Sequence, residues 1–143
     1  MYIVKLIDSF LSDRRCIFDF DPFATYDIHV DCPQGSVLSP FLWAVLIDDA
    51  LRFTVGPRQL TVGYADDISL VTASADPAVT MEELQLLCDR LVDWLRARKL
   101  EVCPTKSVDL TFSRRPAVLA QGRDLSLSFD GSLVSHTTST RFL

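Results

Sequence analysis

The chain has 143 residues, a net charge of −5 and 48% hydrophobic residues, with a mean hydropathy of +0.21. This length corresponds to about one domain, and this hydrophobic content supplies a core and argues against intrinsic disorder. Because phosphate contacts need Lys and Arg, a free-standing nucleic-acid binder is usually basic. The net negative charge therefore argues against tight binding of nucleic acid by this chain alone, and we expect weak binding.

The cysteine spacing and the apolar stretches argue against a zinc protein, a secreted protein and a membrane-spanning protein. No C-x-x-C pair occurs and only two histidines are present, so no zinc pattern emerges and free thiols in a reducing compartment are expected. Lys5 and Asp8 interrupt the first apolar stretch, which argues against a signal peptide. No run of about 18 apolar residues is present, so we expect no membrane-spanning helix.

The first half of the chain predicts a helix, two strands and a second helix. Apolar residues recur at helical spacing over 1–11, and strands are expected at 16–20 and 26–30. Ser39 is the expected N-cap of a helix that is apolar almost all round through Phe53, which predicts a buried helix. The exceptions are Asp48 and Asp49, which we expect to point to solvent near the helix end.

Two aspartates then lie between two apolar runs. Residues 60–63 and 68–71 are rich in β-branched and large apolar side chains, which predicts two strands joined by a tight turn at Tyr64-Ala65-Asp66-Asp67. Adjacent like charges are costly unless a cation or water surrounds them, and carboxylate oxygens are the ligands that Mg²⁺ prefers. The stretch therefore indicates half of a metal site, although a plain solvated turn remains the alternative.

The second half predicts a long helix, a strand and a hairpin. Thr80 and Glu83 fit a capping box, and an apolar stripe follows that packs a helix on a sheet: Leu84, Leu87, Cys88, Leu91 and Leu95. Alternating residues over 108–112 predict a half-buried strand with Val108 facing inward. Asp130-Gly131 is typical of a hairpin turn.

Two ordered motifs carry a family resemblance. The string from Asp31 to Trp43 contains Pro-Gln-Gly-Ser-Val-Leu-Ser-Pro and resembles motif B of the reverse transcriptase family, while Tyr-Ala-Asp-Asp at 64–67 resembles its motif C. Cys-Pro-Gln-Gly followed by Leu-Trp is most similar to reverse transcriptases of non-LTR retrotransposons. Asp31 departs from the pattern, since Gly is more usual there.

The resemblance implies an α+β fold, a polymerase palm-like, mostly antiparallel sheet with helices packed on one face. It covers 1–143 as a palm-region fragment that runs from after motif A to just before motif E and lacks fingers and thumb. Asp19 and Asp21 superficially resemble motif A, but Gln34 follows too closely for the intervening helix. We therefore expect the motif A aspartate to lie outside this chain.

The implied activity is template-directed nucleotidyl transfer by an RNA-directed DNA polymerase that uses two Mg²⁺ or Mn²⁺ ions. By resemblance Asp66 is the principal metal ligand and Asp67 a weaker one, with a third carboxylate from motif A. Lys106 corresponds to a motif D lysine that is proposed to protonate the leaving pyrophosphate. An ordinary exposed lysine is an almost equally weighted alternative.

The family's partners are an RNA template, a DNA primer and dNTPs, in the nucleus or cytoplasm. By resemblance, the residues of this chain that would contact template–primer or nucleotide are Pro33, Gln34, Gly35, Ser36, Tyr64 and Ala65. Without motif A and thumb, we expect the isolated chain to be inactive.

Two alternatives remain open at this point. A degenerate or domesticated retroelement remnant would fold without catalysis, and an unrelated acidic α+β binding module would share only the pattern. The genomic sequence upstream of Met1 separates an active element from a remnant, because an open frame encoding a motif A aspartate supports activity.

Overall fold

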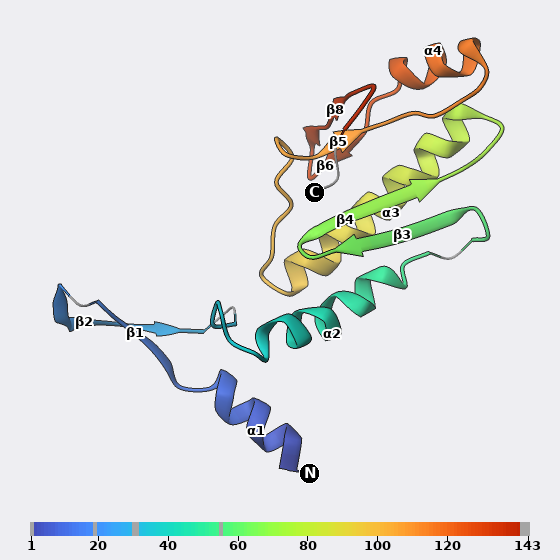
Figure 1. The fold of residues 1–143 in the computed structure, drawn as a ribbon. Coiled ribbons are helices and arrows are strands. Elements are labelled where there is room, and N and C mark those ends of the chain that lie inside the picture. Colours follow the sequence, from blue (N-terminus) through green and yellow to red (C-terminus); the bar gives the residue numbers. More distant parts are fainter. Residues whose placement is uncertain (1, 19, 30–31, 55, 141–143) are drawn as a thin grey trace. The chain divides into compact units, whose positions relative to one another are not determined.

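The computed structural model describes residues 2–18, 20–29, 32–54 and 56–140, and Figure 1 draws their helices and strands. Asp19 and Asp31 lie outside the described residues, as do 141–143 of the segment 140–143 that is expected to approach motif E. The chain divides into two compact units, residues 1–45 and 46–143, and each is described by itself. The assignment of 1–143 to one palm-region fragment therefore stays a prediction.

The first unit contains a helix and a hairpin. Helix α1 (Tyr2–Leu11) forms where helical spacing predicted it, but none of its residues is buried. Asp13 has a φ of 52° and turns the chain directly into β1 (Arg14–Phe18), which pairs antiparallel with β2 (Asp21–Ile28). Both strands exist as predicted, but β1 begins two residues and β2 five residues before the expected starts at 16 and 26.

Helix α2 (Ser39–Leu51) crosses from the first unit into the second. The N-cap prediction is wrong: Ser39 is already helical, and its N–H donates to Ser36 Oγ at 3.0 Å. The prediction of a fully buried helix is also wrong, since Phe41 is 61% exposed while only Ile47 and Ala50 are buried among the described helix residues. An apolar sequence shows that a helix can be buried, but its side chains become buried only where another helix or strand packs against them.

The second unit is built on one hairpin and one long helix. Strands β3 (Gln59–Tyr64) and β4 (Asp67–Thr72) pair antiparallel without a register shift, as predicted. Helix α3 (Pro77–Ala97) contacts β4 and runs alongside the hairpin (Figure 1).

The start of α3 differs from the capping-box prediction. The N-cap is Asp76, whose carboxylate accepts from the Ala78 N–H at 2.9 Å, and Pro77 follows in the first turn. Thr80 instead lies inside that turn and its hydroxyl donates to the Asp76 carbonyl at 2.9 Å. Asp and Pro together form an earlier start than Thr80 offers, because Pro favours the first helical position.

The apolar stripe of α3 forms the core, as predicted. Of the predicted residues, Leu87, Cys88, Leu91 and Leu95 are buried and Leu84 is partly buried, while Trp94 is buried without having been predicted. Cys88 packs with Leu127, Phe129 and Val134, which come from the C-terminal part of the chain. Full burial of a large aliphatic or aromatic side chain contributes about 1.5–3 kcal/mol to the free energy of folding. This cluster therefore stabilises the packing of the C-terminal segment against α3.

Short elements complete the second unit. They are β5 (Val108–Asp109), α4 (Pro116–Asp124), β6 (Ser128–Phe129), β7 (Ser132–Leu133) and β8 (Ser135–His136). The predicted hairpin is confirmed, with Asp130 at a φ of 50° and Gly131 at 76° between β6 and β7. Helix α4 was not predicted.

The strand predicted at 108–112 is mostly wrong. Only Val108 and Asp109 are in a strand, and their facing is inverted, since Asp109 is buried and Val108 is exposed. The cause is a long-range pairing: β5 lies parallel to β8, which places Asp109 opposite His136.

Within the described ranges, the strands form four two-stranded sheets, three antiparallel and one parallel. The mixed helix-and-strand class is therefore confirmed, with small, mainly antiparallel sheets. One continuous palm-like sheet with helices on one face remains a prediction. The described helices include none long and apolar enough to cross a membrane.

Candidate active site

The Tyr64-Ala65-Asp66-Asp67 stretch is the turn of the β3–β4 hairpin. Tyr64 pairs with Asp67, which leaves Ala65 and Asp66 as the two turn residues. Ala65 has a φ of 51°, a left-handed conformation that costs a residue with a Cβ roughly 1–2 kcal/mol. The pairing of the flanking strands therefore holds a strained turn that presents Asp66 at its tip.

The hairpin is held against neighbouring elements at both ends. Near the turn, a Cβ added to Gly63 would lie 3.0 Å from Leu51 Cδ2, so glycine permits the close approach of α2 to β3. At the other end, Thr72 Oγ1 donates to the Thr80 carbonyl at 3.0 Å. These contacts fix the hairpin between the C-terminal part of α2 and the first turns of α3.

The two faces of the hairpin differ in exposure. Thr61 is buried, and the cross-strand partner Leu70 is half-buried against the core. On the opposite face Val62 is exposed and Tyr64 is 70% exposed. Asp67 shares the face of Tyr64 because the two residues are directly paired.

Asp66 and Asp67 are both exposed, and among the described residues neither carboxylate takes part in an ion pair. Two free, hard oxygen ligands fit a divalent cation such as Mg²⁺. No group of three or more His, Cys, Asp or Glu side chains that could hold a metal occurs in the described part of the chain. The hairpin thus offers part of a ligand set, and a complete site needs further oxygen ligands.

The motif B-like loop lies in the first unit and is braced by serines. Ser39 Oγ donates to the Pro33 carbonyl at 2.7 Å and lies 2.6 Å from Ser36 Oγ. Gly35 has a φ of 80°, and an added Cβ would meet nothing within 4 Å, while Gln34 is exposed. Gly35 and Gln34 are therefore open to a ligand, whereas Ser36 also has a structural role.

Lys106 lies in a turn just before β5 and is exposed. Its backbone N–H donates to the Cys103 carbonyl at 3.1 Å. Among the described residues, no hydrogen bond or ion pair joins Lys106 to Asp66 or Asp67. Its assignment to the site stays a prediction.

Sequence reasoning missed two polar contacts of the second unit. His136 Nδ1 lies 2.8 Å from Asp109 Oδ2, with the Asp109 side chain 5% exposed and that of His136 22%. Asp49 is exposed, as expected, with 61% of its side chain accessible, but it also accepts hydrogen bonds from Trp94 and Arg98. Both contacts join residues far apart in sequence, so no local pattern could have predicted them.

A hairpin that exposes two adjacent carboxylates can supply oxygen ligands to a divalent cation, the kind of ion that enzymes of phosphoryl chemistry bind. The sequence profile described as reverse transcriptase (RNA-dependent DNA polymerase) matches residues 2–143. The chain belongs to this family.

Curated relatives agree with the profile. The RNA-directed DNA polymerase from mobile element jockey of Drosophila melanogaster is 27% identical over 150 residues, which cover 100% of this chain and 16% of the relative. The polymerase of the same name from Drosophila funebris is 30% identical over 149 residues, covering 99% and 16%. A retrovirus-related Pol polyprotein from the type-1 retrotransposable element R1 of Nasonia vitripennis is 27% identical over 116 residues, covering 78% and 34%.

The chain therefore spans about a sixth of the length of the jockey polymerases that it matches. It is a segment of a reverse transcriptase domain that is homologous to polymerases of non-LTR retrotransposons. No solved structure matches the chain.

Proposed function

We propose that this chain is the segment of an RNA-directed DNA polymerase that carries part of its metal site. The observation that carries the proposal is the β3–β4 hairpin, which exposes Asp66 and Asp67 side by side within Tyr-Ala-Asp-Asp. Membership of the reverse transcriptase family supports it. RNA template, DNA primer and dNTPs are the partners proposed for the complete enzyme.

The proposed reaction is nucleotidyl transfer. A primer 3′-hydroxyl attacks the α-phosphorus of a dNTP, a new P–O bond forms, and the bond to pyrophosphate breaks. Asp66, at the tip of the turn, is the principal ligand for Mg²⁺ or Mn²⁺, and Asp67, on the Tyr64 face of β4, is the weaker one. When bound, two such ions stabilise the charge on the attacking and leaving oxygens. A third carboxylate from elsewhere in the complete polymerase finishes the ligand set.

Other residues have proposed supporting roles. Gln34 and Gly35, both exposed, contact the template–primer or the nucleotide together with Pro33 and Ser36. Tyr64 and Ala65 flank the metal ligands and contact the same substrates. Lys106 donates a proton to the leaving pyrophosphate. In the complete enzyme these parts belong to one palm-like sheet with helices on one face.

The second candidate is a remnant that folds without catalysis. The Asp66-Asp67 turn fits it equally well, because two adjacent aspartates are also common in a solvated hairpin turn. The second candidate predicts that a complete polymerase carrying this segment would bind substrates but not extend a primer.

The experiment measures primer extension by a complete jockey-type polymerase in which this segment replaces the corresponding one. We expect extension with Mg²⁺ and a loss of roughly a hundredfold or more for Asp66→Asn, because Asn keeps the size but removes the charge that holds the cation. Asp67→Asn should cost less. Asp48→Asn, on the exposed side of α2, is the matched control and should extend normally.

Two results would decide against the catalytic assignment. Wild-type extension rates for Asp66→Asn would mean that the hairpin is not the metal site. A correctly folded chimera that binds primer–template but never extends it would support the remnant.

A further inference from the structure

The second unit contains a pocket that the polymerase site does not use. It has a volume of about 230 Å³, and its described lining residues are Thr111, Phe112, Ser113, Leu119, Arg123, His136 and Thr138. This volume is smaller than the roughly 300–1,000 Å³ of sites for drug-sized ligands. A small group such as a phosphate with its attached sugar suits it better.

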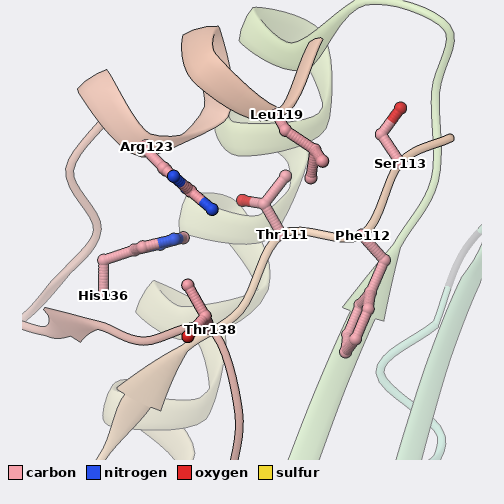
Figure 2. Close-up of a pocket in the computed structure, with 7 residues that line it drawn as sticks. All are labelled: Thr111, Phe112, Ser113, Leu119, Arg123, His136 and Thr138. Atoms are coloured by element: carbon pink, nitrogen blue, oxygen red, sulfur yellow. The ribbon is translucent and has the colours of Figure 1, made fainter. Parts of the chain in front are cut away.

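The packing of α4 forms one wall of the pocket. A Cβ added to Gly122 would lie 2.6 Å from Thr111 Cγ2, so only glycine allows α4 to approach the segment after β5 so closely. Arg123 is the next residue of the helix and turns into the pocket beside Thr111 (Figure 2). The close contact between Gly122 and Thr111 therefore positions both α4 and the Arg123 guanidinium at the pocket.

The opposite wall is β8, whose His136 is held in a fixed orientation. An ionised carboxylate only accepts hydrogen bonds, so Nδ1 of His136 donates to the buried Asp109 Oδ2 at 2.8 Å. The other ring nitrogen, Nε2, has no hydrogen-bond partner among the described residues and donates to an anionic ligand when the ring is protonated. In Figure 2 the side chains of His136 and Arg123 both extend toward the same part of the pocket, near Thr111.

The described lining of the pocket contains a positively charged side chain and no negatively charged one. Among the described lining residues there is no carboxylate, and Arg123 has no ion-pair partner in the described part of the chain. Hydroxyl groups of Thr111, Ser113 and Thr138 add hydrogen-bond donors. In a chain of net charge −5, the Arg123 guanidinium, these hydroxyls and an imidazole that donates from Nε2 when protonated form a site suited to an anion.

A carboxylate–imidazole pair is also part of a nucleophilic triad, which would need a hydroxyl hydrogen-bonded to the second ring nitrogen. No such bond to His136 exists among the described residues, so the pair lacks a nucleophile. The guanidinium opposite the ring favours anion binding.

We propose that the pocket between α4 and β8 binds a phosphate group through Arg123, His136 and the hydroxyls of Thr111 and Thr138. The phosphate can belong to a nucleic-acid strand or to a free nucleotide. Phe112, 85% exposed at the pocket edge, offers a ring on which an attached base can stack. This site is separate from the Asp66 hairpin and does not rest on the proposed polymerase function.

The test follows the imidazole signals of His136 by NMR in the 143-residue chain during titration with three probes. These are inorganic phosphate, a nucleoside monophosphate and a short single-stranded oligonucleotide without a terminal phosphate. We expect saturable shifts and an affinity loss of about tenfold or more in Arg123→Gln, because one charge-assisted contact is removed. Arg58→Gln removes the same charge from an exposed residue outside the pocket lining and should bind like wild type.

Saturation by the oligonucleotide alone assigns the phosphate to a nucleic-acid strand, and saturation by phosphate and monophosphate assigns it to a free nucleotide. Thr138→Ala, at an exposed position, gives a second variant that should weaken binding without disturbing the fold. Either of two results overturns the proposal: His136 signals that do not move with any probe, or equal losses in Arg123→Gln and Arg58→Gln.

Discussion

The indole nitrogen of Trp94 donates a hydrogen bond of 2.7 Å to Oδ2 of Asp49. The Arg98 guanidinium donates to the same oxygen at 2.7 Å and lies over the indole ring, 4.1 Å from its centroid. Because Trp94 is buried, the Asp49 carboxylate replaces water as the hydrogen-bond acceptor of its indole N–H. Asp49 therefore links the C-terminal part of α2 to the last turns of α3.

We expect Asp49→Ala to lower the free energy of unfolding by about 1–3 kcal/mol, because a buried donor and a cation lose their acceptor. Urea unfolding followed by circular dichroism measures the loss. The matched control is Asp48→Ala, which removes an exposed pair with Arg52 at i,i+4 and should cost only about 0.3–0.5 kcal/mol. Equal losses in the two variants would contradict a special role for Asp49.

Much of the hairpin could be predicted from sequence, because its determinants are local. Alternating apolar residues specify β3 and β4, and two turn residues fix the register that pairs Tyr64 with Asp67. The same reasoning predicted the Asp130-Gly131 turn. The same local determinants place Asp66 and Asp67 at the hairpin turn.

Long-range contacts could not be predicted in this way. The parallel pairing of β5 with β8 joins residues from distant parts of the chain and places Asp109, which is buried, opposite His136, while Val108 is exposed. Helix α4 follows Arg115, which makes no side-chain cap bond, so its start lacks the usual capping pattern. The pocket lined by Arg123 and His136 depends on both features.

The turn residue Ala65 gives a prediction about stability. Ala65→Gly should raise the free energy of unfolding by about 1 kcal/mol, because glycine adopts a φ of 51° without the cost that a Cβ imposes. Ala120→Gly, at an exposed position inside α4, is the control and should have the opposite sign, with a loss of about 0.5–1 kcal/mol. A destabilised Ala65→Gly variant would show that the turn is not strained.

The close contact of Gly122 with Thr111 gives a second prediction. Gly122→Ala should cost about 1–3 kcal/mol, because the new methyl group would lie 2.6 Å from Thr111 Cγ2. The double variant Gly122→Ala/Thr111→Ala should recover part of that loss, since the opposing side chain is shortened. Denaturant unfolding of both singles and the double measures the coupling, and additive losses would rule out the contact.

The cysteines differ in their ionisation. Burial raises the pKa of the Cys88 thiol to about 12 from its ordinary 9.0. A hydrogen bond with the Thr105 hydroxyl, 3.3 Å from Sγ, lowers the pKa of the exposed Cys103. Because the thiolate is the reactive form, iodoacetamide should modify Cys103 first and Cys88 only after unfolding. Peptide mass spectrometry identifies the sites, and Cys103→Ser should remove the fast phase.

Cys88 also predicts a dependence of stability on pH. The folded pKa is raised, so the stability contributed by the neutral thiol is complete below the unfolded value near 9 and is lost as the pH rises toward 12. Unfolding midpoints measured across this window should fall more steeply in wild type than in Cys88→Ala. Parallel slopes would mean that Cys88 ionises equally in both states.

The last prediction concerns Thr61, on the inward face of β3. Its hydroxyl oxygen is buried and has no hydrogen-bond partner among the described residues. Thr61→Val keeps nearly the same shape and removes that unpaired polar group, so the free energy of unfolding should rise by about 1 kcal/mol or more. Thr72→Val, in the paired strand, is the control: its hydroxyl donates to the Thr80 carbonyl at 3.0 Å, and its loss should cost about 0.5–1.5 kcal/mol. Urea unfolding of the two variants distinguishes them by sign, and a destabilised Thr61→Val would mean that the hydroxyl has a partner in solution.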